Sequence, residues 1–207
     1  MKNKSIDINQ RIPLDTLYIA LESYLDDNYS NDYVLEQLRL EFDGENRLKK
    51  ALRIVNKVIQ RNPLNGLLLE NSAEVKTAIK KKVDRDIILI ALLNSAFPFS
   101  FDVLQKFGKF FAVQEVVNTE TMKKSISNVY GGNRATENGL YSVIPMFLEA
   151  GFFKRPKQGI YEWTGGISST NKITNKIYIE SFKVNNPMAG AAEGQLRDPY
   201  FKFVEYN

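Results

Sequence analysis

Residues 133–141 combine side chains that can contact the edges of DNA bases, and they follow directly after Gly131 and Gly132. An arginine such as Arg134 can donate two hydrogen bonds to guanine, and an asparagine such as Asn138 can pair with adenine. In helix-turn-helix proteins, a helix that begins after a short turn presents its first residues to the major groove. We therefore predict base contacts from Asn133, Arg134, Thr136, Asn138 and Tyr141. Glu137 lies among them and would repel phosphate unless it accepts a hydrogen bond from cytosine.

Basic residues flank this segment on both sides. Lys123 and Lys124 precede it, whereas Lys154, Arg155 and Lys157 follow it. Lysine and arginine contacts with phosphate position a protein on DNA but carry no information about the bases. We predict that these basic residues contact the backbone of the same duplex.

The elements that must hold these residues are two helices and a hairpin. The spacing of apolar residues predicts one helix over 119–130 and a second over 134–150. Alternating residues with a glycine turn predict a hairpin over 152–164. This order resembles a winged helix-turn-helix over residues 118–165, although the same order also occurs as a plain structural connection. Pro145 removes one hydrogen bond from the second helix and predicts a kink after the reading residues.

A basic helix face is the second candidate surface. A helix over residues 45–62 is predicted to place its apolar residues on one side and Lys50, Arg53, Lys57 and Arg61 on the other. A solvated face is the ordinary role of such a stripe, and direct contact with nucleic acid is the alternative. The run Lys80-Lys81-Lys82 has the same two interpretations.

The rest of the chain predicts a mainly α fold. Residues 1–13 resemble a flexible arm, and residues 14–117 have the apolar spacing of a helical bundle. Within the bundle, residues 84–96 are so apolar that a buried central helix is expected, whereas residues 64–71 are expected to form a connection.

The remaining segment, residues 166–207, predicts a small β-rich tail. Residues 173–184 alternate between apolar and polar side chains and are expected to form a strand. A second strand is expected over 200–206, after a loop over 185–199 that is rich in glycine, alanine and asparagine.

The chain of 207 residues contains neither histidine nor cysteine. The usual general base, the Ser–His relay, thiolate catalysis and cysteine zinc sites are therefore excluded. We expect no enzymatic activity, no metal and no cofactor. No run of about 18 uncharged apolar residues could span a bilayer, and no apolar segment follows the basic N-terminus, so we expect a cytoplasmic protein without membrane contact.

The net charge of +4 is distributed unevenly along the chain. Residues 14–46 carry nine acidic side chains and one basic one, whereas residues 47–85 carry eleven basic and three acidic ones. Residues 103–160 carry eight basic and four acidic side chains. This asymmetry favours either a surface that faces a polyanion or the pairing of acidic with basic helices inside the protein.

Several segments together resemble the BrxA-type proteins of BREX phage-defence systems. Over residues 30–155 they are a helix with Arg53 and Arg61 that ends at Asn62-Pro63, the apolar helix Ile87 to Leu93, the aromatic segment Phe97-Pro98-Phe99-Ser100-Phe101-Asp102, and Asn133-Arg134-Ala135-Thr136 leading to Leu148-Glu149-Ala150-Gly151-Phe152. The resemblance implies a helical bundle like that of the antiterminator NusB, DNA binding and no enzymatic activity. The hairpin and residues 166–207 depart from the family's pattern.

The functional hypothesis is a non-enzymatic accessory or regulatory protein that binds double-stranded DNA, with protein partners in a defence complex. One alternative is an interaction or scaffold subunit that binds no nucleic acid and uses its acidic helices against a basic partner. Another is an RNA-binding helical bundle.

Overall fold

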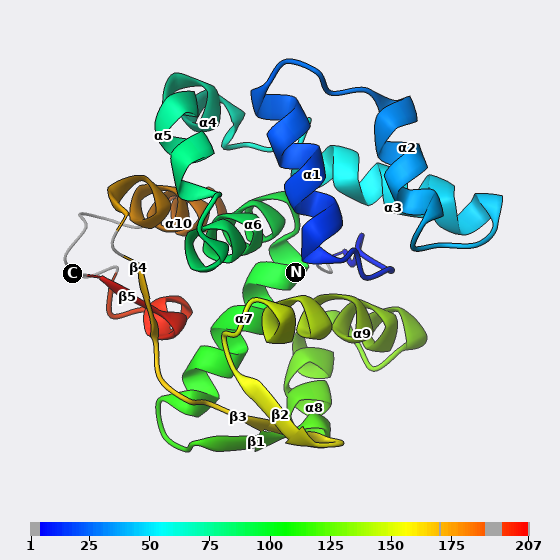
Figure 1. The fold of residues 1–207 in the computed structure, drawn as a ribbon. Helices are drawn as coiled ribbons and strands as arrows, with labels where there is room; N and C mark the ends of the chain where they lie inside the picture. Colours follow the sequence, from blue (N-terminus) through cyan, green and yellow to red (C-terminus); the bar gives the residue numbers. More distant parts are fainter. Residues whose placement is uncertain (1–4, 170, 189–195, 207) are drawn as a thin grey trace.

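The chain folds mainly into helices, and the computed structural model describes residues 5–169, 171–188 and 196–206 (Figure 1). The N-terminal helices are α1 (Leu14–Leu25), α2 (Asn31–Arg39), α3 (Glu45–Val58), α4 (Asn65–Glu70), α5 (Ser72–Ala78), α6 (Lys82–Ala96) and α7 (Pro98–Phe111). The middle of the chain forms β1 (Val116–Asn118), α8 (Thr119–Tyr130), α9 (Arg134–Glu149), β2 (Lys154–Lys157) and β3 (Ile160–Glu162). The C-terminal part forms β4 (Ile167–Ser169), α10 (Lys172–Asn185), the 3-10 turn η1 (Pro199–Phe203) and β5 (Val204–Tyr206).

Helix α6 lies at the centre, with α1, α3, α7 and α10 packed around it (Figure 1). Residues 87–93 of α6 have no exposed surface. Burial on every side explains why this segment is a continuous apolar run rather than the one-sided stripe of a surface helix. The charged side chain of Asp86 is also buried, and ion pairs with Arg85 and Lys82 neutralise it.

A three-stranded antiparallel sheet lies next to α7 and α8 (Figure 1). The strand order is β1-β3-β2, and Val117 of β1 pairs with Tyr161 of β3. Beneath the sheet, the ring of Phe107 lies 4.4 Å from that of Phe153 and 5.2 Å from that of Tyr161, measured between ring centres. These aromatic contacts attach the hairpin to α7.

The predicted strand over residues 173–184 is wrong, because these residues form α10. The side chain of Asn171 starts the helix by accepting a hydrogen bond from the N–H of Ile173 at 3.2 Å. The buried residues have the spacing of one helix face, and they are Ile173, Thr174, Ile177, Tyr178, Ser181 and Phe182. The alternation at 177–180 is too short to outweigh this periodicity.

The strand predicted over 200–206 is correct only for Val204–Tyr206, because Pro199–Phe203 form the 3-10 turn η1. Strands β4 and β5 are parallel neighbours, and η1 packs against α7. A Cβ atom at Gly108 would lie 1.9 Å from the carbonyl oxygen of Pro199, so this close approach requires glycine in α7. Tyr200 is fully buried, stacks on Tyr178 with ring centres 4.6 Å apart, and shares a hydrogen bond with Ser181.

Other elements also differ from the predictions. Residues 65–70 form α4 instead of a plain connection, and the short strand β1 was not predicted. Residues 5–13 of the predicted arm lie against the body, where Ile8 and Ile12 are fully buried. Residues 1–4 of that arm and 189–195 of the predicted loop lie outside the described residues. In the described part of the chain, no single helix is long and apolar enough to cross a bilayer, and the pair α6 and α7, which passes that test together, is bent by 120°.

Candidate nucleic-acid interface

Asparagine and glycine residues determine where α8 and α9 begin and end. The side chain of Asn118 caps α8 by accepting a hydrogen bond from the N–H of Thr121 at 2.7 Å. Gly131 follows the helix with a φ of +87°, which glycine adopts without steric cost. Asn133 then caps α9 by accepting from the N–H of Thr136 at 3.1 Å. The first turn of α9 therefore begins at Arg134.

Helix α9 buries one side and leaves its first turns exposed on the other. Leu140, Val143 and Phe147 are buried. A Cβ atom at Gly139 would lie 2.7 Å from the ring of Phe99, so α9 packs closely against α7. The side chains exposed on the opposite side have helical spacing and are those of Arg134, Glu137, Asn138 and Tyr141.

Thr136 does not share this exposure. The residue is 1% exposed, and its hydroxyl donates to the carbonyl of Gly131 at 2.6 Å. The prediction that Thr136 contacts a base is therefore wrong, because the residue stabilises the turn instead. Asn133 is exposed, but its Oδ1 accepts the hydrogen bond that caps α9.

A hollow of about 270 Å³ lies between α8, α9 and the hairpin. Its apolar lining includes Met122, Leu140, Ile144 and Leu148. Its polar lining brings together Lys123 of α8, Tyr141 of α9 and Arg155 of β2, with Gln158 in the hairpin turn. Three of the predicted residues, from three separate elements, thus share one concave surface.

Pro145 also lines this hollow, and α9 continues past it to Glu149. Because proline has no N–H, the carbonyl of Tyr141 lacks its donor within the helix. The missing bond joins residues 141 and 145. The hydrogen bonding of the first turns, which carry Arg134 and Asn138, is therefore unaffected.

Lys123 is held by groups from both helices. Its Nζ atom lies 3.5 Å from a carboxylate oxygen of Glu120, 3.8 Å from one of Glu137, and 5.7 Å from the ring centre of Tyr141. A hydrogen bond with Tyr141 raises the pKa of Lys123, burial opposes this increase, and the charges of Glu120 and Glu137 add to it, so the ammonium group remains protonated at neutral pH. The ion pair with Glu137 connects α8 to the first turn of α9 and lowers the charge that Lys123 offers to phosphate.

The hairpin presents its basic residues to solvent. Every residue of the edge strand β2 is exposed, including Lys154, Arg155 and Lys157. Pro156 is tolerated there, because an edge strand leaves one side without ladder hydrogen bonds. Among the described residues, no carboxylate forms an ion pair with these three side chains, with Arg134 or with Lys124. These side chains therefore keep their full positive charge for a polyanion.

The basic side of α3 is partly neutralised by the N-terminal segment. Lys57 forms an ion pair with Asp7, and Arg53 donates a hydrogen bond to the backbone carbonyl of Asp7 at 3.2 Å. Lys50 and Arg61 are exposed, but α3 ends at Val58, so Arg61 lies beyond the observed helix, although the prediction placed it within the helix. The four predicted residues do not form one continuous unpaired face.

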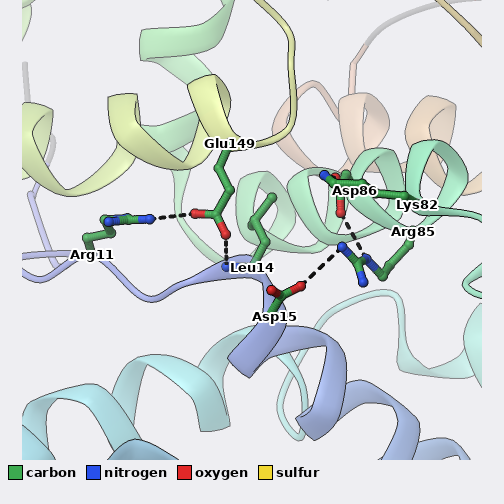
Figure 2. Close-up of polar contacts among 7 residues, drawn as sticks. All are labelled: Arg11, Leu14, Asp15, Lys82, Arg85, Asp86 and Glu149. Atoms are coloured by element: carbon green, nitrogen blue, oxygen red, sulfur yellow. Dashed lines mark hydrogen bonds and ion pairs between the residues drawn. The ribbon is translucent and has the colours of Figure 1, made fainter. Parts of the chain in front are cut away.

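The far end of α9 is anchored to the bundle through Glu149, which the sequence does not single out. Figure 2 shows its carboxylate at the start of α1, where Oε1 accepts from the N–H of Leu14 at 2.9 Å and Oε2 pairs with Arg11 at 2.7 Å. Pro13 precedes Leu14 and supplies no side-chain cap. The carboxylate of Glu149 therefore supplies, from another helix, the acceptor that α1 lacks locally.

A second group of contacts in Figure 2 joins α1 to α6. The Nη2 atom of Arg85 lies 3.1 Å from Asp15, and its Nε atom lies 3.0 Å from Asp86. The guanidinium also lies 4.9 Å from the ring centre of Tyr18. Helix α1 is thus attached to α9 at its first residue and to the central helix within its first turns.

Tyr141 of α9 and Arg155 of the basic edge strand thus meet at the hollow, whereas Arg134 and Asn138 do not line it. Among the residues that the structure describes, no group of three or more acidic side chains is arranged to hold a metal ion. Comparisons with protein-family models, with curated proteins and with solved structures found no match for this chain.

Proposed function

We propose that this protein binds double-stranded DNA through α9 and the β2–β3 hairpin. The observation that carries the proposal is the exposure of Arg134 and Asn138 at the start of α9, the helix whose Tyr141 lines the hollow together with Arg155 of the exposed, basic edge strand. The order α7-β1-α8-α9-β2-β3, with the sheet order β1-β3-β2, resembles that of winged helix-turn-helix proteins. In helix-turn-helix proteins the second helix enters the major groove.

Each exposed side chain has its own role in this proposal. Arg134 pairs with guanine and Asn138 with adenine, because these side chains match the donors and acceptors that those bases present in the major groove. Lys154 and Lys157 contact phosphates and position the protein without selecting a sequence. Arg155 lines the hollow and contacts the backbone beside them.

The bundle surface is the weaker candidate. Asp7 engages both Lys57 and Arg53, so a phosphate would have to compete with a carboxylate already in place. Among the described residues, no carboxylate pairs with the basic side chains of the hairpin, so a phosphate would displace none. A role for the bundle in binding RNA would need the same side chains and is tested alongside.

A binding titration with duplex DNA at several salt concentrations tests the proposal. Each neutralised phosphate contributes a slope of about −0.9 to the logarithm of the association constant against the logarithm of the salt concentration. Four or five phosphate contacts would therefore give a slope of roughly −4. A duplex RNA of the same length serves as the comparison. Absence of binding at low salt would instead favour an interaction subunit whose acidic helices α1 and α2 contact a basic protein.

Two sets of variants then distinguish the side chains that recognise bases from those that contact phosphates. Arg134→Ala and Asn138→Ala should each weaken binding to a preferred sequence by roughly 1–3 kcal/mol. Lys154→Ala and Lys157→Ala should weaken binding to all sequences about equally and reduce the salt slope by about one unit each. Lys176→Ala on α10 removes another exposed lysine from a distant helix and should change neither the affinity nor the salt slope.

A further variant tests the competing surface. If the bundle binds the nucleic acid, Arg53→Glu should abolish binding while Arg134→Ala remains silent. That outcome would move the site to α3 and leave the nucleic-acid function intact. If both variants still bound nucleic acid as the wild-type protein does, neither surface would be the binding site. A place in a phage-defence complex, which the resemblance to BrxA-type proteins implies, belongs to the same proposal and depends on DNA binding.

A further inference from the structure

Glu137 is a carboxylate on the surface that we propose to face DNA, where a negative charge should repel phosphate. The residue lies in the first turn of α9, and its side chain is 52% exposed. It shares the exposed side of α9 with Arg134, Asn138 and Tyr141. Its position within the reading surface therefore needs an explanation other than attraction to the backbone.

The structure reduces the repulsion through Lys123. The Nζ atom of Lys123 lies 3.8 Å from a carboxylate oxygen of Glu137, so the two charges partly cancel. Lys123 is itself fixed by Glu120 at 3.5 Å and by the ring of Tyr141. An ammonium group held in this way favours one position of the Glu137 carboxylate. Because Lys123 engages only one carboxylate oxygen, the second oxygen can still accept a hydrogen bond.

An ionised carboxylate only accepts hydrogen bonds, and this property selects among the bases. In the major groove guanine presents two acceptors and thymine one acceptor beside a methyl group. Adenine presents a donor next to the N7 acceptor, which repels a carboxylate, whereas cytosine presents its N4 amine alone. Among the four bases, cytosine is therefore the one that best matches a negatively charged acceptor.

We infer that Glu137 determines sequence specificity by accepting a hydrogen bond from the N4 amine of a cytosine in the major groove. The inference rests on the proposed DNA binding and names one of the base pairs that this surface selects. Arg134 and Glu137 then recognise bases of opposite character, since one donates and the other accepts.

Selection of binding sites from a pool of random duplexes tests the inference, followed by titration of single sites. The wild-type protein should enrich one position with cytosine, and replacing that C·G pair by T·A should lower its affinity roughly 5- to 150-fold. Glu137→Gln should lose this preference and gain adenine at the same position, because an amide both accepts and donates. Glu137→Ala should lose the preference for cytosine without gaining adenine.

Glu180→Gln is the matched control. It removes the same charge from a carboxylate that also pairs with a lysine, but on α10 rather than on the reading helix. We expect the selected sequence to stay unchanged in this variant. The inference is overturned if no selected cytosine responds to Glu137→Gln, or if Glu137→Gln raises the affinity for every sequence by the same factor. Failure of the wild-type protein to bind any duplex would instead overturn the proposed function, and the inference with it.

Discussion

Removing the carboxylate of Glu149 tests how firmly α9 is anchored to the bundle. Its Oε1 atom accepts from the N–H of Leu14 at the start of α1, and its Oε2 atom pairs with the half-exposed side chain of Arg11. Loss of a helix cap costs about 1 kcal/mol, and an ion pair at the surface contributes roughly 0.2–1 kcal/mol. We therefore expect Glu149→Ala to lower the free energy of unfolding by about 1–2 kcal/mol, which corresponds to a decrease in Tm of roughly 2–8 °C for a chain of this size.

Two further variants separate the two contacts. Glu149→Gln keeps an amide oxygen that can accept from Leu14 but loses the ion pair, so its loss should stay below about 1 kcal/mol. Arg11→Ala removes the ion pair and leaves the cap, so its loss should be of the same small size. Urea denaturation followed by circular dichroism measures the free energy of unfolding of all three variants, and the slope against urea should stay constant.

Comparing the stabilities of these three variants can refute the capping role of Glu149. If Glu149→Ala and Arg11→Ala lost the same stability, the hydrogen bond to Leu14 would contribute nothing, and the capping explanation would be wrong. If Glu149→Gln lost as much as Glu149→Ala, the charge rather than the acceptor oxygen would carry the effect. Only a larger loss in Glu149→Ala than in both other variants agrees with the geometry.

Three other predictions concern the packing of the tail, alkaline pH and a helix cap. Gly108→Ala places a methyl group 1.9 Å from the carbonyl oxygen of Pro199 and should destabilise the fold by about 1–3 kcal/mol; Gly66→Ala, with no atom within 4 Å, should be neutral or slightly stabilising in the same urea denaturation. Burial raises the pKa of Tyr200 from 10.0 to about 12, so the folded state keeps a proton that the unfolded state releases. Stability should therefore be insensitive to this group below pH 10 and fall as the pH rises from 10 toward 12. In denaturation curves of Tyr200→Phe the fall should be smaller but still present, because burial also raises the pKa of Tyr29 and of Tyr130. Asn118→Ala removes the cap of α8 and should lower the free energy of unfolding by about 1 kcal/mol in thermal denaturation.

The elements that the sequence predicts well are those whose signals are local. The turn between α8 and α9 follows from two adjacent glycines and the cap at Asn133, and the buried run of α6 follows from its composition. Strand β1 has only three residues, and its partner β3 lies more than forty residues away in the chain, so no local pattern identifies it. The error at α10 has a different cause, because a short alternation at 177–180 coincides with a longer helical periodicity.

In the candidate site, too, some features follow from local sequence signals and others depend on contacts that the sequence does not reveal. Exposure of Arg134 and Asn138 follows from the periodicity of α9 and needs no tertiary information. The burial of Thr136 follows from its hydrogen bond to a carbonyl in the preceding turn, which the residue type alone does not reveal. The ion pair between Lys57 and Asp7 joins residues 50 positions apart, which no local pattern predicts. The sequence therefore overestimates how many basic side chains of α3 are free to contact nucleic acid.

The proposed reading surface depends on contacts from outside residues 118–165. Gly139 lets α9 pack against the ring of Phe99, in the last helix of the bundle. Just before the hairpin, Phe152 stacks on Phe203 of the C-terminal segment, with ring centres 5.5 Å apart. Recognition of base edges requires side chains held within fractions of an ångström. Because α9 and the hairpin pack on different parts of the chain, their relative position is set by the shared core. If the surface binds DNA as proposed, core residues outside the interface should therefore influence which sequences it selects.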